Sequence, residues 1–143
     1  MAINQLSIFV ENKTGTIVNI TESIAKANVS IRAMSVADTQ GFGILRLIVS
    51  DTDKAKEVLK NNDCVVSVTQ VLGIEIPDVP GGLSKVLKLI SDEGINVEYL
   101  YAFITVSGHR AYVVLRVADN EKATDILTKA GIRTITQEDI EKL

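Results

Sequence analysis

The residues best placed to do chemistry form a short turn at positions 78–83, with the sequence Asp-Val-Pro-Gly-Gly-Leu. Pro80 fixes one backbone dihedral, and the two glycines after it let the chain reverse sharply and let another group approach the main chain. A helix predicted to begin near Leu83 presents its first unpaired N–H groups at the positive end of its dipole, where a carboxylate or phosphate is stabilised. A tight strand-to-helix turn needs Pro and Gly even without a ligand, so the turn alone leaves both interpretations open.

The remaining reactive side chains are not grouped in a catalytic pattern. His109 is expected in an exposed hairpin tip without an acid or nucleophile beside it. Cys64 precedes an apolar run, where a small buried residue is expected rather than a nucleophile. One cysteine and one histidine leave none of the usual metal-ligand spacings. We therefore predict no catalytic residue, no metal and no cofactor.

Three aromatic residues, Tyr99, Tyr101 and Phe103, alternate along one predicted strand and so share a face. They could stack on nucleic-acid bases, line a ligand pocket or be buried in a contact between structural units. The net charge of −3, the pI near 5.2 and the lack of a basic run argue against nucleic acid and against an anionic membrane surface. Nucleic acid and membrane are therefore excluded as expected partners.

Composition predicts an aliphatic core and a cytoplasmic setting. The chain has 143 residues, of which 46% are hydrophobic and 4% aromatic, and it has no Trp. One cysteine permits no internal disulfide, and the N-terminus lacks the pattern of a signal peptide. No apolar run approaches membrane-spanning length.

Hydrophobic periodicity in the first half predicts the order strand, helix, strand, strand, helix, strand. The predicted elements are strands at 4–10, 29–37, 44–49 and 65–69, a helix at 17–27, and a second helix capped by Asp51 or Thr52 that ends at 61–63. Near the C-terminus, residues 136–139 resemble a capping box that opens a last helical turn at 140–143.

The same order of elements then repeats. Residues 12–17 align with 78–83 at a spacing of 66, and this spacing holds up to Ser30 and Asn96. After the hairpin the spacing becomes 68 and places Asp51 on Asp119, with two extra residues expected around Ser107 and Gly108. The chain therefore divides into two domains, 1–70 and 71–143, with Gln70 and Val71 joining one strand to the next.

Each half is a βαββαβ unit, so the predicted fold class is α+β: two ferredoxin-like units in tandem, each an antiparallel four-stranded sheet with helices on one face. The Pro-Gly-x-Leu type of turn, followed by a helix and then Gly94-Ile95-Asn96-Val97, resembles the ACT domain, an amino-acid-sensing module. The whole chain resembles stand-alone tandem ACT proteins. The first copy departs from the motif at Thr14, where Pro is usual, and at Ser30, where Asn is usual.

The resemblance implies a regulatory protein, not an enzyme, that binds a free amino acid at a contact between two ACT units. The implied binding residues are Asn12, Lys13, Thr14, Gly15 and Thr16 in the first turn, Asp78, Val79, Pro80, Gly81, Gly82 and Leu83 in the second, and Ser30, Ile31, Asn96 and Val97 where strands begin. Helix N–H groups would hold the ligand carboxylate, and carbonyl oxygens with Asn12 would hold the ammonium. Because Asn12 both donates and accepts, we favour its turn as the polar clamp, completed by Asn96 or Ser30.

Several partners follow from this interpretation. Exposed edges of small sheets predict a homodimer, and a sensor needs a regulated metabolic enzyme or a transcription factor to act on. An interaction module without a ligand remains an alternative. A small acyl-phosphate hydrolase is a second one, although such enzymes need an arginine in the turn, where this chain has Lys13 and Val79.

Overall fold

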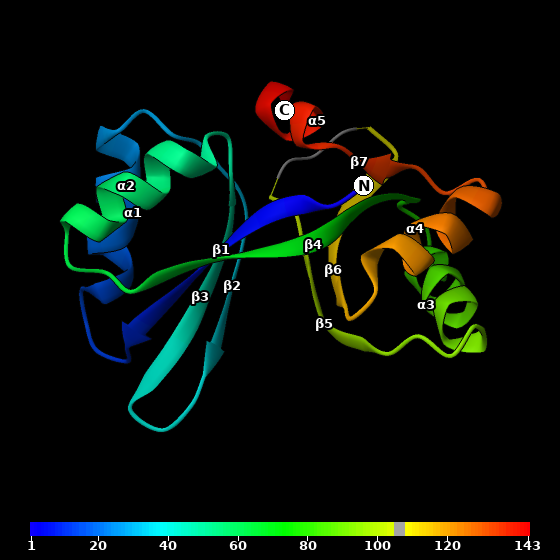
Figure 1. Ribbon diagram of the computed structural model, residues 1–143, viewed down its shortest axis with the longest axis horizontal. Coiled ribbons are helices and arrows are strands. Elements are labelled where there is room, and N and C mark those ends of the chain that lie inside the picture. The colour runs from blue at the N-terminus through cyan, green and yellow to red at the C-terminus, as the bar shows by residue number, and fades with distance from the viewer. Residues whose placement is uncertain (105–107) are drawn as a thin grey trace. The chain divides into compact units, whose positions relative to one another are not determined.

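Two units, each an antiparallel sheet covered on one face by two helices, make up the chain (Figure 1). The structure is a computed structural model that describes residues 1–104 and 108–143. The predicted insertion at Ser107 lies outside the described residues. Contacts divide the chain into a first repeat unit, Asn4–Thr69 with Ile140–Leu143, and a second repeat unit, Gln70–Asp139 with Met1–Ile3.

The elements follow the predicted order in both units. They are β1 (Ile3–Glu11), α1 (Thr16–Lys26), β2 (Ile31–Asp38), β3 (Phe42–Val49), α2 (Thr52–Asn61), β4 (Val66–Pro77), α3 (Gly82–Asp92), β5 (Val97–Ala102), β6 (Arg110–Val117), α4 (Asn120–Lys129), β7 (Thr134–Ile135) and α5 (Gln137–Lys142). The strand order is β2-β3-β1-β4 in the first repeat unit and β5-β6-β4-β7 in the second. The predicted α+β class and the repeated βαββαβ order are therefore confirmed.

One difference concerns the junction of the repeats. The sequence predicts one strand at 65–69 and a new one after Gln70 and Val71, whereas β4 runs unbroken from Val66 to Pro77. The segment holds β-branched residues and no Pro or Gly before Gly73, so nothing in it interrupts the extended backbone.

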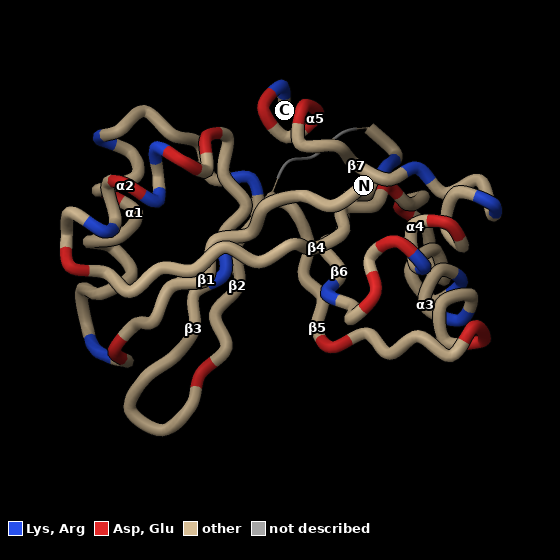
Figure 2. The backbone as a smooth tube through the Cα atoms, viewed as in Figure 1, with Lys and Arg blue, Asp and Glu red and all other residues tan. Residues whose placement is uncertain are grey.

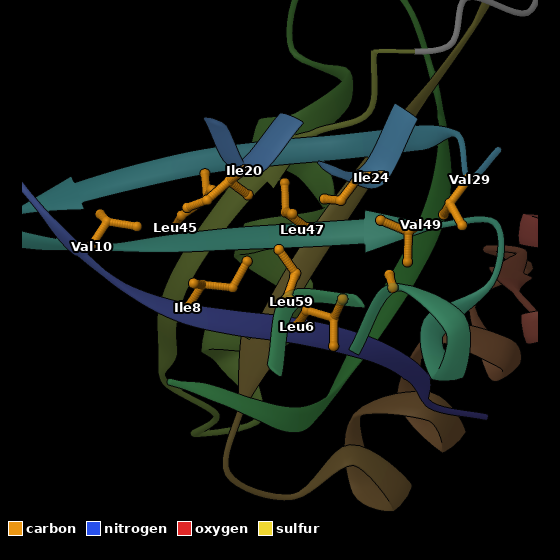
Figure 3. Packing of buried hydrophobic residues seen from close by; sticks show 11 residues of the cluster. Leu6, Ile8, Val10, Ile20, Ile24, Val29, Leu45, Leu47, Val49 and Leu59 are labelled. Carbon is orange, nitrogen blue, oxygen red and sulfur yellow. The ribbon is translucent and has the colours of Figure 1, made fainter. Parts of the chain in front are cut away.

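In the first repeat unit, the core lies between the sheet and the helices α1 and α2. Leu6 and Ile8 on β1 pair with Leu47 and Leu45 on β3, and all four side chains are fully buried. Figure 3 shows Ile20, Ile24 and Leu59 pointing from the helices toward these strands. The second repeat unit builds the same core from Leu72, Ile74, Val86, Ile90, Val113, Leu115 and Leu127.

The helix ends also repeat, which confirms the alignment. Asp51 accepts a hydrogen bond from the Lys54 N–H at 3.0 Å, and Asp119 accepts one from the Lys122 N–H at 3.0 Å. An N-cap of this kind satisfies a free donor of the first helical turn. The predicted capping box is present as well: the Asp139 N–H donates to Thr136 Oγ1 and the Thr136 N–H to Asp139 Oδ2.

Candidate functional site

The two predicted turns have the same backbone geometry. Gly15 and Gly81 are the N-cap residues of α1 and α3, with φ of 92° and 84°, a conformation that glycine adopts without strain. In both turns the N–H of the residue after the glycine donates to the carbonyl three residues earlier. Thr16 donates to the Lys13 carbonyl, and Gly82 donates to the Val79 carbonyl. The two turns thus start their helices in the same way.

Each turn leaves helix donors unused. Among the described residues, the N–H groups of Ile17 and Val18 in α1 and of Leu83 and Ser84 in α3 donate to no acceptor. Neither helix has a side-chain cap or an acidic residue in its first turn. The start of each helix is therefore electropositive and open to an anionic group.

The turn residues and the strand-start residues are not adjacent within one unit. In the second repeat unit, α3 separates the turn at 78–82 from Asn96 and Val97, and its 11 residues span about 16 Å. The same holds in the first repeat unit for the turn at 12–16, helix α1 and Ser30 and Ile31, because α1 also has 11 residues. One amino acid is too small to contact both groups of residues in a single unit.

Two open hollows lie along α3 and share Leu87 and Ser91. One, of about 680 Å³, begins at the turn with Val79, Gly81 and Leu83. The other, of about 560 Å³, extends past Asn96 to Leu100 on β5. The side of the second repeat unit formed by α3 and β5 is therefore a concave surface with apolar walls and a few polar groups.

The first turn is bordered by a much smaller hollow of about 70 Å³, which Asn12, Lys13, Ile17 and Val36 line in part. Lys13 Nζ lies 2.8 Å from Glu11 Oε2, with both side chains exposed. Their hydrogen bond, and then their opposite charges, lower the pKa of Glu11 and raise the pKa of Lys13. Lys13 therefore already has a carboxylate partner in the unliganded chain.

The strand-start residues of the two repeats differ in their free polar groups, which sequence reasoning missed. The Ser30 N–H donates to Ser50 Oγ, and the Ser30 carbonyl accepts from the Ser50 N–H. Position 118, which corresponds to Ser50, is Ala. Among the described residues, the backbone N–H and carbonyl of Asn96 have no hydrogen-bond partner. The sequence signal that could have revealed this difference is Ser50 in the first repeat against Ala118 at the aligned position of the second.

Most of the predicted site residues are accessible. The exposed residues among them are Asn12, Lys13, Thr14, Ser30, Asp78, Val79, Pro80, Gly81 and Asn96. The half-buried ones are Gly15, Thr16, Ile31, Leu83 and Val97. Gly82 is buried, and a Cβ on it would run into the Pro77 carbonyl oxygen. Gly82 is thus needed for the close approach of turn and strand.

The other candidate residues are placed as follows. His109 is exposed, and its carbonyl accepts from the Asp78 N–H. Tyr99 and Tyr101 stack with ring centroids 6.5 Å apart, and Tyr101 and Phe103 are buried. Cys64 is half-buried, and burial, followed by the Asp63 charge, raises the pKa of its thiol. Among the described residues, no helix has the length and apolar character needed to cross a bilayer.

Comparison with solved structures shows the same fold over nearly the whole chain. Protein BT0572 from Bacteroides thetaiotaomicron is 42% identical, with 100% of this chain and 98% of that chain covered and a TM-score of 0.92. The regulatory subunit of aspartate kinase from Thermus thermophilus is 13% identical, with coverage of 89% and 91% and a TM-score of 0.64. The corresponding subunit from Thermus flavus is 14% identical, with coverage of 90% and 92% and a TM-score of 0.61.

No curated protein matches the sequence. The family described as an ACT domain pair matches residues 1–143. The chain therefore belongs to the ACT domain pair family.

Proposed function

We propose that this protein is a non-catalytic regulator that binds a free amino acid at a contact between two ACT units. The observation that carries the proposal is the pair of unused N–H groups at the start of each helix, beside a glycine turn. These donors suit the ligand carboxylate. The proposal also draws on the family, and on the aspartate kinase regulatory subunits that share the fold.

The site that we favour joins the turn at 12–16 to Asn96 and Val97 of another unit. The first turn offers the Ile17 and Val18 donors and the Asn12 amide, which both donates and accepts. Asn96 offers a backbone N–H and carbonyl that bond no other group in the described part of the chain, and the carbonyl suits the ligand ammonium. The complementary pairing joins the turn at 78–83 to Ser30 and Ile31. It has fewer available polar groups, because the Ser30 N–H already donates to Ser50 Oγ.

Binding between units explains how occupancy would be transmitted. A ligand that contacts two units stabilises the arrangement in which they meet, and only this difference in affinity between arrangements can regulate a partner. The partner would be a metabolic enzyme or a transcription factor, and the expected assembly is a cytoplasmic homodimer.

A thermal-shift screen of the twenty amino acids tests the proposal. A ligand at a hundredfold excess over its Kd stabilises the folded state by about 2.7 kcal/mol. Asn12→Ala and Asn96→Ala should each reduce the shift strongly, while Asn61→Ala, an exposed asparagine of α2, serves as the matched control. No shift with any amino acid contradicts sensing, and a shift that survives both variants places the ligand elsewhere.

A second candidate function is that of a docking module that binds no small molecule. Phe9 and Phe42 stack at 5.8 Å between centroids and remain 56% and 45% exposed, and exposed aromatic residues are enriched at protein interfaces. This function would be favoured by two results together. A protein partner is captured by the natural chain but not by Phe9→Ser, and no amino acid produces a thermal shift. Turnover of an acyl phosphate would instead support the hydrolase alternative.

A further inference from the structure

The sheet of the first repeat unit has one face without helices, and two exposed aromatic residues lie on it. Along β3, Leu45 and Leu47 pack in the core under α1 and α2, so the residues that alternate with them face the other way. Phe42 on β3 and Phe9 on β1 stack there, with ring centroids 5.8 Å apart and exposed fractions of 45% and 56%. Val65, whose carbonyl accepts from the Phe9 N–H, is 69% exposed. We call Phe9, Phe42 and Val65 the apolar platform.

The second repeat unit has the same backbone at this place but a different surface. The aligned pairs are Phe9 and Glu75, Phe42 and Arg110, and Val65 and Arg133. The Glu75 N–H donates to the Arg133 carbonyl, and this bond repeats the one made by the Phe9 N–H. The Glu75 carboxylate lies 3.0 Å from Arg110 Nε and 2.7 Å from Arg133 Nη1. The fold therefore does not require apolar side chains at these positions, and exposed apolar groups that the fold does not need indicate a binding surface.

One basic residue lies on the same face, next to the apolar platform. Arg46 on β3 is directly opposite Ser7 on β1 and Ser35 on β2, so neither cross-strand neighbour is acidic. Residues 39–45, which form the tip of the β2–β3 hairpin, carry no charged side chain (Figure 2). The residue aligned with Arg46 is Val114, which is fully buried. Because a guanidinium has five N–H donors, Arg46 can hold a carboxylate in addition to its present neighbours.

The size and the flatness of this face decide what kind of partner fits it. Burying an aromatic side chain removes roughly 150–250 Å², so the exposed halves of the two phenylalanines offer about 200 Å². A stable interface needs about 800 Å² from each partner, so this face alone does not hold a second copy of the chain. None of the three hollows described above is lined by Phe9, Phe42 or Arg46, and a small molecule needs a concave site. The occupant that fits is a short segment of another protein.

Spacing along β3 determines the conformation of that segment. Rows on one face of a strand are about 7 Å apart, and Phe9 lies opposite Ile44, so Phe42, Phe9 and Arg46 occupy three successive rows. Side chains at positions i, i+4 and i+8 of an α-helix are spaced similarly, about 6 Å apart along its axis. An extended segment could match the rows too, but its backbone would find no partners, because β1 and β3 are paired on both sides. A helix bonds its own backbone and therefore fits this face better.

We propose that the protein regulated by this chain docks an amphipathic helix on the helix-free face of the first repeat unit. Two apolar side chains of that helix, at positions i and i+4, contact Phe42 and Phe9, and an acidic side chain at i+8 bonds Arg46. This inference rests on the regulatory role proposed above and names the surface through which that role is exerted. Interfaces of this small size are transient, which suits a partner that is released when the regulator changes state.

A display library of helical peptides with randomised surface positions tests the inference on the full chain, without added amino acid. Selected peptides should share two apolar residues four positions apart, followed four positions later by Asp or Glu. Their affinity, measured by fluorescence anisotropy, should fall about tenfold or more in Phe9→Ser and in Phe42→Ser. Val18→Ser, which replaces an apolar residue of α1 that is 50% exposed, is the matched control and should stay within about twofold.

Arg46→Gln separates the charge contact from a structural role. The natural chain should bind a selected peptide with Glu at i+8 about threefold to fivefold more tightly than the same peptide with Gln there. In Arg46→Gln the two peptides should bind equally, and about 1 M salt should reduce the difference in the natural chain. Loss of folding would instead weaken both peptides alike, and circular dichroism detects it. Equal binding of the two peptides by the natural chain refutes the contact with Arg46.

Three other results overturn the inference. They are a library that yields no binder, selected peptides that bind Phe9→Ser as tightly as the natural chain, and a dimer in sedimentation that Phe42→Ser dissociates, since a second copy would then cover the face. The same samples enter the amino-acid thermal-shift screen. A shift without peptide binding refutes the docking face and leaves sensing standing, whereas peptide binding without a shift refutes sensing and leaves the docking face standing.

Discussion

Ser50 Oγ accepts a hydrogen bond from the Ser30 N–H at 2.9 Å, and the aligned pair in the second repeat, Ala118 and Asn96, cannot make this contact because alanine has no side-chain acceptor. The two repeats share their fold but differ, among the described residues, in which backbone polar groups at the strand start are already hydrogen-bonded. This difference leads to the first prediction.

Ala118→Ser should weaken the thermal shift that an amino acid produces, because the new hydroxyl competes for the Asn96 N–H. Ser50→Ala should lower the free energy of unfolding by about 0.5–1.5 kcal/mol, through loss of one hydrogen bond, and should leave the shift at the favoured site in place. Urea titration and thermal shift on both variants measure the two effects. Equal loss of the ligand response in both would contradict the proposed difference between the sites.

Gly15→Ala and Gly81→Ala should each destabilise the protein by about 1–2 kcal/mol, because alanine at φ of 92° or 84° is strained. Gly82→Ala should cost more than Gly81→Ala, since its Cβ would overlap the Pro77 carbonyl oxygen. Ser84→Ala, on the exposed side of α3, is the control and should change stability by less than about 0.5 kcal/mol. A harmless Gly82→Ala would show that the turn relaxes easily.

Glu75→Gln should destabilise the second repeat unit by about 1–3 kcal/mol. The Glu75 side chain is 12% exposed and lies 3.0 Å from Arg110 Nε and 2.7 Å from Arg133 Nη1. Arg133 also bonds Asp139 at the capping box, so the change should loosen the start of α5, which hydrogen exchange would detect. Asp92→Asn, which breaks an exposed ion pair with Lys88, should cost less than about 0.5 kcal/mol; equal losses would rule out a special role for Glu75.

Cys64 in the folded protein should be alkylated more slowly than an unfolded thiol near pH 8–9. Burial first, and the Asp63 charge second, raise its pKa, and only the thiolate reacts. The folded state binds the thiol proton more tightly than the unfolded state does. The protonated thiol therefore stabilises the fold at lower pH, and this stabilisation is lost as the pH rises through the folded pKa. Alkylation rates across pH, with and without urea, test the shift, and Asp63→Asn should move the folded profile slightly toward lower pH. Identical pH profiles of alkylation in the folded and unfolded states would refute the raised pKa of Cys64.

Local features of the fold were accessible from the sequence. The glycine turns, the Asp51 cap and the alternation along β1 each depend on residues close together in the chain, so their types and spacing suffice to predict them. The spacing of 66 residues between the turns also predicted two similar units, because one hydrophobic pattern occurs twice. The unbroken β4 was missed, since two strands that meet without a turn look separate when each is assigned to its own repeat.

By itself, the sequence determined the family, the repeated fold and the two helix-starting turns, because these follow from short-range patterns. The tertiary structure decided which backbone groups are already bonded, as at Ser30, and that each turn lies a helix length from the strand start in its own unit. Such facts depend on residues that are distant in the chain and become neighbours only when the sheets form, so no local pattern encodes them.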